Sequence, residues 1–104
     1  MASGKLDESQ AIFQKCVDLN PKFAPAVSNL GYTYFLKGDV AYAGTLFDKA
    51  LALDPDYEQG LMNKAALFIS QYRIEEAKKI LQRVLQINPE NEKAKLALKQ
   101  LNIL

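Results

Sequence analysis

The chain of 104 residues contains no histidine and no tryptophan, a single cysteine, and almost equal numbers of positive and negative charges. Without histidine it cannot build a Ser-His-Asp or Cys-His nucleophile, nor a metal site based on imidazole. Cys16 has no second cysteine with which to form an internal disulfide or a thiolate metal site. With 13 Lys and Arg against 12 Asp and Glu, the chain also lacks the basic excess of a dedicated nucleic-acid-binding protein. We therefore expect no catalytic residues, no metal, no cofactor and no nucleic-acid partner.

Long apolar runs are also missing. No stretch approaches the roughly 20 consecutive apolar residues that span a bilayer, and the first residues lack the apolar core of a secretory signal. We expect no membrane insertion and, by default, a cytoplasmic location, while the compartment of any longer parent protein stays open. A chain of this length that is 49% hydrophobic is typical of one compact domain or a short repeat array.

An internal repeat is the strongest pattern that is present. The pairs Asn20-Pro21, Asp54-Pro55 and Asn88-Pro89 place three prolines at intervals of 34 residues. Each pair follows an apolar helical stripe. Proline lacks an amide hydrogen and disfavours the helical conformation of the residue before it, so each pair predicts the end of a helix.

Between these prolines, apolar residues recur at spacings of three and four, which indicates amphipathic helices. The Gly38-Asp39 break divides the first interval into two such stripes, and the same pattern returns 34 residues later. The unit is therefore predicted to be two antiparallel helices joined by a short turn. Small residues at Gly31 and Ala65, and again at Ala43 and Ala77, let the two backbones approach each other.

This pattern resembles the tetratricopeptide repeat family, whose unit is a helix-turn-helix of 34 residues. The resemblance is carried by Leu30, Gly31, Tyr34, Gly38, Asp39, Ala43, Phe47, Ala50 and Pro55. It implies an all-α fold, a right-handed α-solenoid of antiparallel helix pairs with about six helices. The sequence departs from the family pattern at Val27 and Leu61, which replace an aromatic residue, and at Lys64 and Tyr72.

The register divides the chain into four segments. Residues 24–57 and 58–91 are two complete repeats, and residues 1–23 match only the second helix of a truncated repeat, with Gly4 at the turn position. Residues 92–104 are predicted to form a capping helix, because the positions that are apolar in the preceding first helix carry Lys95, Lys99 and Asn102. A polar outer face is what a solenoid needs where stacking stops. We therefore expect the chain to be the C-terminal end of a longer array.

In this family the first helix of each unit lines a concave groove that receives an extended peptide or a helix of a partner. The resemblance therefore implies a non-catalytic protein-protein interaction module. Carried over position by position, the predicted binding residues are Ser28, Asn29, Tyr32, Phe35, Gln59, Met62, Asn63, Ala66, Ile69 and Lys93. Asn29 and Asn63 should stack along the groove, where a carboxamide can donate to and accept from a peptide backbone. The alternative is that these asparagines are simply common at this position of the family.

The apolar groove positions allow two interpretations. Aromatic and methionine side chains are typical anchors of interaction sites, but the same residues could pack between neighbouring first helices. A subset of the family clamps the C-terminal carboxylate of its ligand with Lys and Asn side chains. Only Asn63 and Lys93 match that clamp, because Ser28, Tyr32 and Ala97 stand where Lys, Asn and Arg are needed. We therefore predict that the chain lacks this clamp.

A second functional hypothesis is structural. The chain could be an assembly segment that self-associates through its N-terminal helix, around Phe13.

Three further residues have expected roles of their own. Lys64 falls on a buried stripe and should extend its ammonium to the surface, and Cys16 aligns with Ala50 and Val84 and should be a small core residue. Tyr72 replaces the turn glycine and should be strained if the turn is left-handed.

Overall fold

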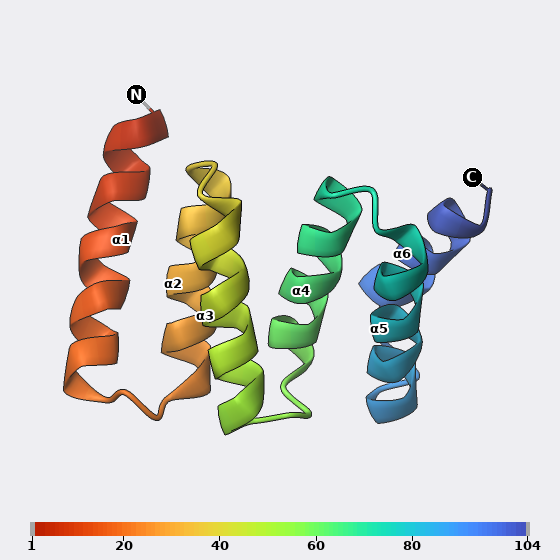
Figure 1. Ribbon diagram of the computed structural model, residues 1–104. Helices are drawn as coiled ribbons and strands as arrows, with labels where there is room; N and C mark the ends of the chain where they lie inside the picture. Colours follow the sequence, from red (N-terminus) through yellow and green to blue (C-terminus); the bar gives the residue numbers. More distant parts are fainter. Residues whose placement is uncertain (1, 104) are drawn as a thin grey trace.

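The computed structural model describes residues 2–103, and in that part of the chain it contains six helices and no strand. Met1 and Leu104, the outermost residues of the first and last predicted segments, lie outside the described range. The helices are α1 (Ala2–Leu19), α2 (Ala24–Leu36), α3 (Val40–Leu53), α4 (Glu58–Ser70), α5 (Ile74–Ile87) and α6 (Glu92–Ile103). They stand side by side in chain order, so the two ends of the chain lie at opposite ends of a row that measures 38 × 29 × 21 Å (Figure 1).

The three proline pairs end helices, as predicted. α1, α3 and α5 stop at Leu19, Leu53 and Ile87, each directly before an Asx-Pro pair. The capping residues Asp54 and Asn88 have extended backbones, with φ of −144° and −139°, as expected for a residue before proline. Their side chains also accept hydrogen bonds from the amides of Asp56 and Glu90, which closes the turn.

The turn inside each helix pair requires a left-handed residue. Gly38, between α2 and α3, has a φ of 93°, and Tyr72, between α4 and α5, has a φ of 59°. Glycine adopts this region freely, whereas a tyrosine there is strained because of its Cβ atom. The strain expected at Tyr72 is therefore confirmed, and its side chain, at 88% exposure, makes little contact that could offset it.

The core lies between the helices of each pair and between neighbouring pairs. Phe47, Leu30, Leu81, Val27 and Val84 are almost completely buried. The close approach predicted at Gly31 is confirmed, because a Cβ atom built there would lie 2.9 Å from the ring of Phe47. Ala65, at the same position of the next pair, is 1% exposed. Small residues at this position thus let α2 pack on α3, and α4 on α5, through their backbones.

Two expectations for α1 are wrong. Cys16 is exposed rather than part of the core, whereas Ala50 at the same position of α3 is fully buried. The reason is that α2 covers this face of α3, while no helix within residues 2–103 covers the same face of α1. Gly4 does not form a turn but lies inside α1, which begins at Ala2.

α6 packs on the second pair and exposes the positions that its sequence pattern makes polar. Ala94 and Leu101 are buried against α4 and α5, whereas Lys95, Lys99 and Asn102 are exposed.

Lys64, on α4, also behaves as expected for a long side chain on an apolar stripe. The side chain of Lys64 is 28% exposed, and its ammonium reaches the carboxylate of Asp48 at 2.8 Å.

Candidate functional site

The predicted binding residues gather on the side of the molecule formed by the first helices α2, α4 and α6. A hollow of about 380 Å³, hereafter the groove, is lined by Asn29, Tyr32, Gln59, Met62, Asn63, Ala66 and Lys93. Seven of the ten residues singled out from the sequence therefore border one depression. The placement follows from helix geometry, because positions separated by three, four and seven residues share a face, and Gln59, Met62, Asn63 and Ala66 form such a stripe on α4.

Ser28 and Asn63 form the polar seam between α2 and α4. The Nδ2 amide of Asn63 donates to the hydroxyl of Ser28 at 2.8 Å, and both residues are buried. The Nε2 amide of Gln59 donates to the Oδ1 atom of Asn63 at 2.9 Å. Asn63 is thus held by two internal partners, and Ser28 lies beneath the groove instead of lining it.

Of the two predicted asparagines, Asn29 has the side chain with more hydrogen-bonding capacity left for a ligand. It is half-buried at the edge of the groove, and its side chain forms no hydrogen bond with any residue between 2 and 103. Its carboxamide therefore retains two donors and an acceptor for a ligand. The two asparagines border the same groove, as the sequence suggested, but they differ in what they can offer.

The apolar residues divide between the groove and the core. Tyr32 is 41% exposed and lines the groove together with the half-buried Met62 and Ala66. Phe35 lies at a tilted angle to Tyr32, with 6.1 Å between the ring centroids, and packs against a core cluster that contains Phe47 and Leu67. Ile69 packs against the core of the second pair. Phe35 therefore adjoins the groove through Tyr32, whereas Ile69 belongs to the core, and neither residue lines the groove.

The position of Lys93 depends on a network that sequence reasoning missed. The carboxylate of Glu58, in the first turn of α4, accepts hydrogen bonds from the Nδ2 amides of Asn91 and Asn88, both at 2.9 Å. These bonds, first that from Asn91, lower the pKa of Glu58 below its ordinary value. Asn91 also accepts from the amide of Ala94 at 2.9 Å and so caps α6. A carboxylate on α4 thereby fixes the start of α6 and, with it, the exposed Lys93.

The described residues contain neither a candidate metal centre nor a membrane-spanning helix. No group of three His, Cys, Asp or Glu side chains is suitably arranged to hold a metal ion within residues 2–103. In the same range no helix combines the length and the apolar character needed to cross a bilayer.

Comparison with known proteins identifies the architecture. A family model described as "Tetratricopeptide repeat" matches residues 1–67 and again residues 37–101. The chain is similar to the first TPR of Spaghetti (RPAP3), solved bound to the HSP90 peptide SRMEEVD, with 28% identity and a TM-score of 0.89 over 98% of this chain and 83% of that one. The first TPR domain of human RPAP3 is also 28% identical, with a TM-score of 0.88 over 98% and 80% of the two chains.

A third similar structure is more distant. It is a thermophilic TPR protein of Thermus thermophilus, with 24% identity and a TM-score of 0.89 over 98% of this chain and 52% of that one. At this identity the likeness concerns the fold alone. No curated protein matches the sequence. Together with the six helices of the structure, these similarities confirm the predicted α-solenoid of antiparallel helix pairs.

Proposed function

The chain belongs to the tetratricopeptide repeat family, and on that premise we propose that it is a non-catalytic module that binds a peptide of a protein partner in the groove. The family is in general a protein-interaction module without catalytic activity. The observation that carries the proposal is the convergence of seven predicted residues, from three different helices, on one depression. The first TPR of Spaghetti (RPAP3), which binds an HSP90 peptide, supports a peptide as the class of ligand.

The composition of the groove indicates how such a peptide would be held. The free carboxamide of Asn29 can pair with a peptide amide and carbonyl, while Tyr32 and Met62 offer apolar surface to a side chain of the ligand. Lys93 adds a positive charge at the α6 side of the groove. Because Ser28, Tyr32 and Ala97 replace the Lys, Asn and Arg of the carboxylate clamp, we propose an internal peptide segment as the ligand rather than a free C-terminus.

Peptides selected from a random display library against the intact chain test this proposal. Binding of the selected peptides, measured by isothermal titration calorimetry, should weaken about tenfold or more in Asn29→Ala and Tyr32→Ala, because each removes one anchor. Gln86→Ala, an exposed change on α5 outside the groove, is the matched control and should bind as tightly as the parent. If the selected peptides bind both groove variants with the affinity of the parent chain, the groove is not their binding site.

A second candidate function, self-association through α1, is favoured by one specific observation. Ile12, Cys16 and Leu19 lie on one side of α1 and are all exposed, with 61% for Ile12 and 78% for Leu19. In α3 the residues equivalent to Ile12 and Cys16, namely Leu46 and Ala50, are buried beneath α2. The outer side of α1 thus offers apolar surface of a kind that a helix covers elsewhere in the same molecule.

Phe13 is not the best residue with which to test this candidate, because it packs against the core cluster around Val17 and Leu30. Ile12→Glu places a charge on the exposed face instead. If the chain self-associates there, analytical ultracentrifugation should show a concentration-dependent dimer that Ile12→Glu abolishes and that Tyr32→Ala leaves intact. A parent chain that stays monomeric at every concentration would exclude this candidate, whereas peptide binding in the groove would be unaffected.

A further inference from the structure

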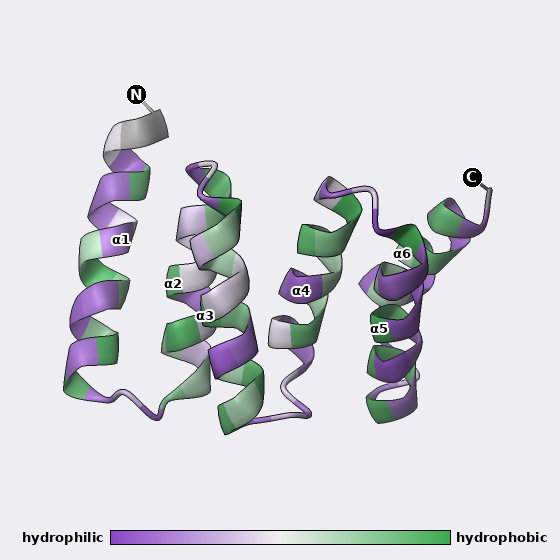
Figure 2. Cartoon of the chain, viewed as in Figure 1, coloured by the Kyte–Doolittle hydropathy of each residue, from purple (hydrophilic) through white to green (hydrophobic). Residues whose placement is uncertain are grey.

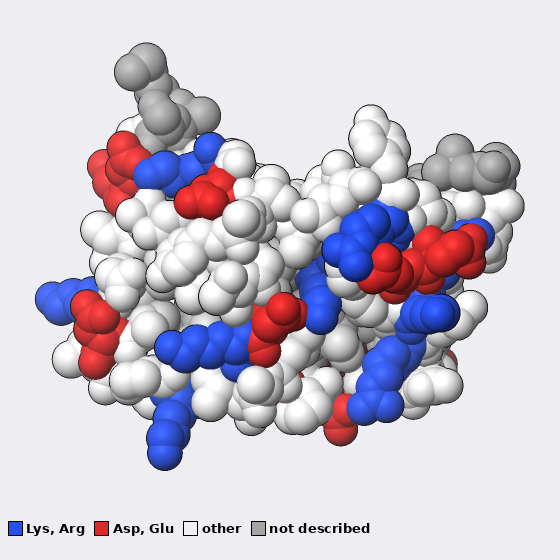
Figure 3. All heavy atoms as spheres, viewed as in Figure 1, with Lys and Arg blue, Asp and Glu red and all other residues white. Residues whose placement is uncertain are grey.

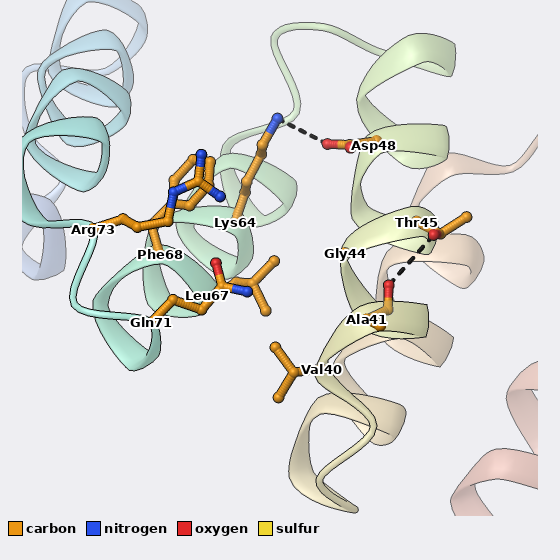
Figure 4. A pocket seen from close by; sticks show the side chains of 10 residues that line it. All are labelled: Val40, Ala41, Gly44, Thr45, Asp48, Lys64, Leu67, Phe68, Gln71 and Arg73. Carbon is orange, nitrogen blue, oxygen red and sulfur yellow. Dashed lines mark hydrogen bonds and ion pairs between the residues drawn. The ribbon is translucent and has the colours of Figure 1, made fainter.

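A second hollow, hereafter the α3–α4 hollow, lies on a different side of α4 from the groove. It has a volume of about 430 Å³ and runs along two turns of α3 (Figure 4). α4 contributes Lys64, Leu67 and Phe68, which share a face because they are separated by three and four residues, and Gln71, which caps the end of α4, continues this face. The remaining lining residues are Val40, Ala41, Gly44, Thr45, Asp48 and Arg73.

The hollow exists because Gly44 interrupts the repeat. The residues 34 positions before and after it are Gln10 and Lys78, both with long side chains. The side chain of Lys78 is only 22% exposed, so at this position it lies against the protein surface. Gly44 carries no such side chain, and Leu67 of α4 approaches its backbone so closely that a Cβ atom built there would lie 3.2 Å away. A missing side chain on α3 and the apolar surface of Leu67 therefore create the floor of the hollow.

Two further departures from the repeat meet in the same place. Lys64 stands where Leu30 and Leu98 occupy the neighbouring first helices, and Arg73 stands where Asp39 caps α3. The ammonium of Lys64 lies 5.6 Å from the centroid of the Phe68 ring, and the Arg73 guanidinium lies 4.5 Å from it. Figure 4 shows both cations flanking this ring at one wall of the hollow. Cations over an aromatic face are held partly by the ring rather than by water alone.

The two cations have more hydrogen-bond donors than the surrounding residues use. Lys64 pairs with Asp48, and Arg73 pairs with Glu76 through two of its five N–H groups. Figure 3 shows this face as positive and negative side chains lying next to one another. The side chains of Asp48 and Glu76 are 62% and 48% exposed, and ion pairs this exposed contribute little to stability. An incoming carboxylate can therefore use the free donors or replace either partner at small cost.

We propose that the α3–α4 hollow is a second docking site, which takes a short acidic segment of a protein partner. A carboxylate of that segment bonds to Lys64 and Arg73, and an adjacent apolar side chain lies on Leu67 beside Gly44. The charge of the two cations, the donors they leave free, and the apolar floor next to them all favour this chemistry. The proposal is independent of the groove, because the two sites share α4 but no lining residue.

Restoring the repeat at these positions provides a test that separates binding from folding. Gly44→Gln introduces the residue found at position 10 and fills the hollow; its gain in helix propensity is offset by the close contact of the new Cβ atom with Leu67, so the melting temperature should stay close to that of the parent chain. Lys64→Leu introduces the residue of positions 30 and 98 and should leave the melting temperature unchanged or higher. Both variants should nevertheless lose binding, so a folding defect cannot be mistaken for the loss of the site.

The probe is the capped peptide acetyl-Gly-Glu-Leu-Glu-Gly-amide, titrated into the isotopically labelled chain while backbone amide shifts are followed by NMR. Saturable shifts at Gly44, Leu67 and Gln71 are expected, and affinity should fall about tenfold in Gly44→Gln, in Lys64→Leu, and for the matched peptide with Gln in place of Glu. Shifts confined to Asn29 and Met62, no saturable shift at all, or unchanged affinity in Gly44→Gln would overturn the proposal. Inorganic phosphate that produces the same shifts and displaces the peptide would overturn it too, in favour of a free-anion site.

Discussion

The pairs α2–α3 and α4–α5 place different residues at the same positions of the repeat. The first pair has Gly31 against Phe47, Gly38 in its left-handed turn, and Asp39 accepting a hydrogen bond from the amide of Tyr42. The second pair has Ala65, the strained Tyr72, and Arg73, which forms no side-chain cap. Figure 2 shows the corresponding contrast in hydropathy, with α3 mostly pale or green and α5 alternating strongly between purple and green. The first pair satisfies local folding preferences, whereas the second departs from them close to the α3–α4 hollow.

The largest effect is expected where the first pair is most tightly packed. Gly31→Val should destabilise the chain by about 3 kcal/mol, because its side chain would collide with Phe47 and Leu46, both of which are buried. Ala65→Gly, which gives the second pair the residue of the first, creates no collision and should cost only about 1 kcal/mol through lost helix propensity. Urea denaturation of both variants measures the difference. Equal losses would mean that the collision expected at Gly31 does not occur.

The next effect concerns the seam between the two pairs. Asn63→Ala leaves the hydroxyl of Ser28 buried without its partner, and should cost about 2 kcal/mol. Combining it with Ser28→Ala should cost less than the two single changes added together, because the partners no longer leave each other unpaired. Urea denaturation of the two single variants and the double variant forms the cycle. Additive costs would mean that the hydrogen bond contributes nothing to joining the pairs.

A smaller effect of opposite sign is expected at the turns. Tyr72→Gly should stabilise the chain by about 1 kcal/mol, because glycine relieves the positive φ and the exposed ring makes few contacts. Gly38→Ala should lose a similar amount through backbone strain alone, since a Cβ atom there meets nothing within 4 Å. Thermal melting measures both variants. Melting temperatures that both rise or both fall would contradict the predicted difference between the two turns.

The smallest effect depends on pH and belongs to the second pair alone, because Ala24 occupies the position of Glu58 in the first. The hydrogen bonds from Asn91 and Asn88 lower the folded-state pKa of Glu58 below its ordinary value of 4.5. Their stabilising contribution is therefore fully present above that value and is lost as the pH falls through the lower folded-state pKa. Glu58→Gln should show a smaller drop in melting temperature between neutral and acidic pH than the parent chain. An identical drop would assign the acid sensitivity to other carboxylates.

Much of the fold could be predicted because short sequence motifs determine where each helix ends, and these motifs recur along the chain. The Asx-Pro pairs end helices through proline stereochemistry, and Gly38 predicts the conformation of Tyr72 because the two occupy the same position. The shared position of the residues that line the groove, such as Asn29 and Met62, could likewise be predicted, since helix periodicity places residues three and four apart on one face.

The remaining features depend on partners that the repeat register does not specify. Cys16 was expected in the core because Ala50 is buried, but burial at this position requires a covering helix. Asn63 was expected to face a ligand, yet its partners Ser28 and Gln59 come from the packing of α2 on α4 and from the preceding turn of α4. The α3–α4 hollow was missed because it arises from three exceptions to the repeat, at Gly44, Lys64 and Arg73, which only the folded chain brings together.

The exposure of Cys16 has a practical consequence. It is the only thiol in the sequence, and it lies on α1, which contributes no residue to the groove or to the α3–α4 hollow. A maleimide dye or spin label would therefore attach at one defined position without altering any other residue. Fluorescence anisotropy of a chain labelled in this way would report the binding of a partner protein large enough to slow its tumbling, and bulky labels would block any contact made through the outer side of α1. Cys16, which was expected in the core, thus provides a single labelling site with which to study the groove and the α3–α4 hollow.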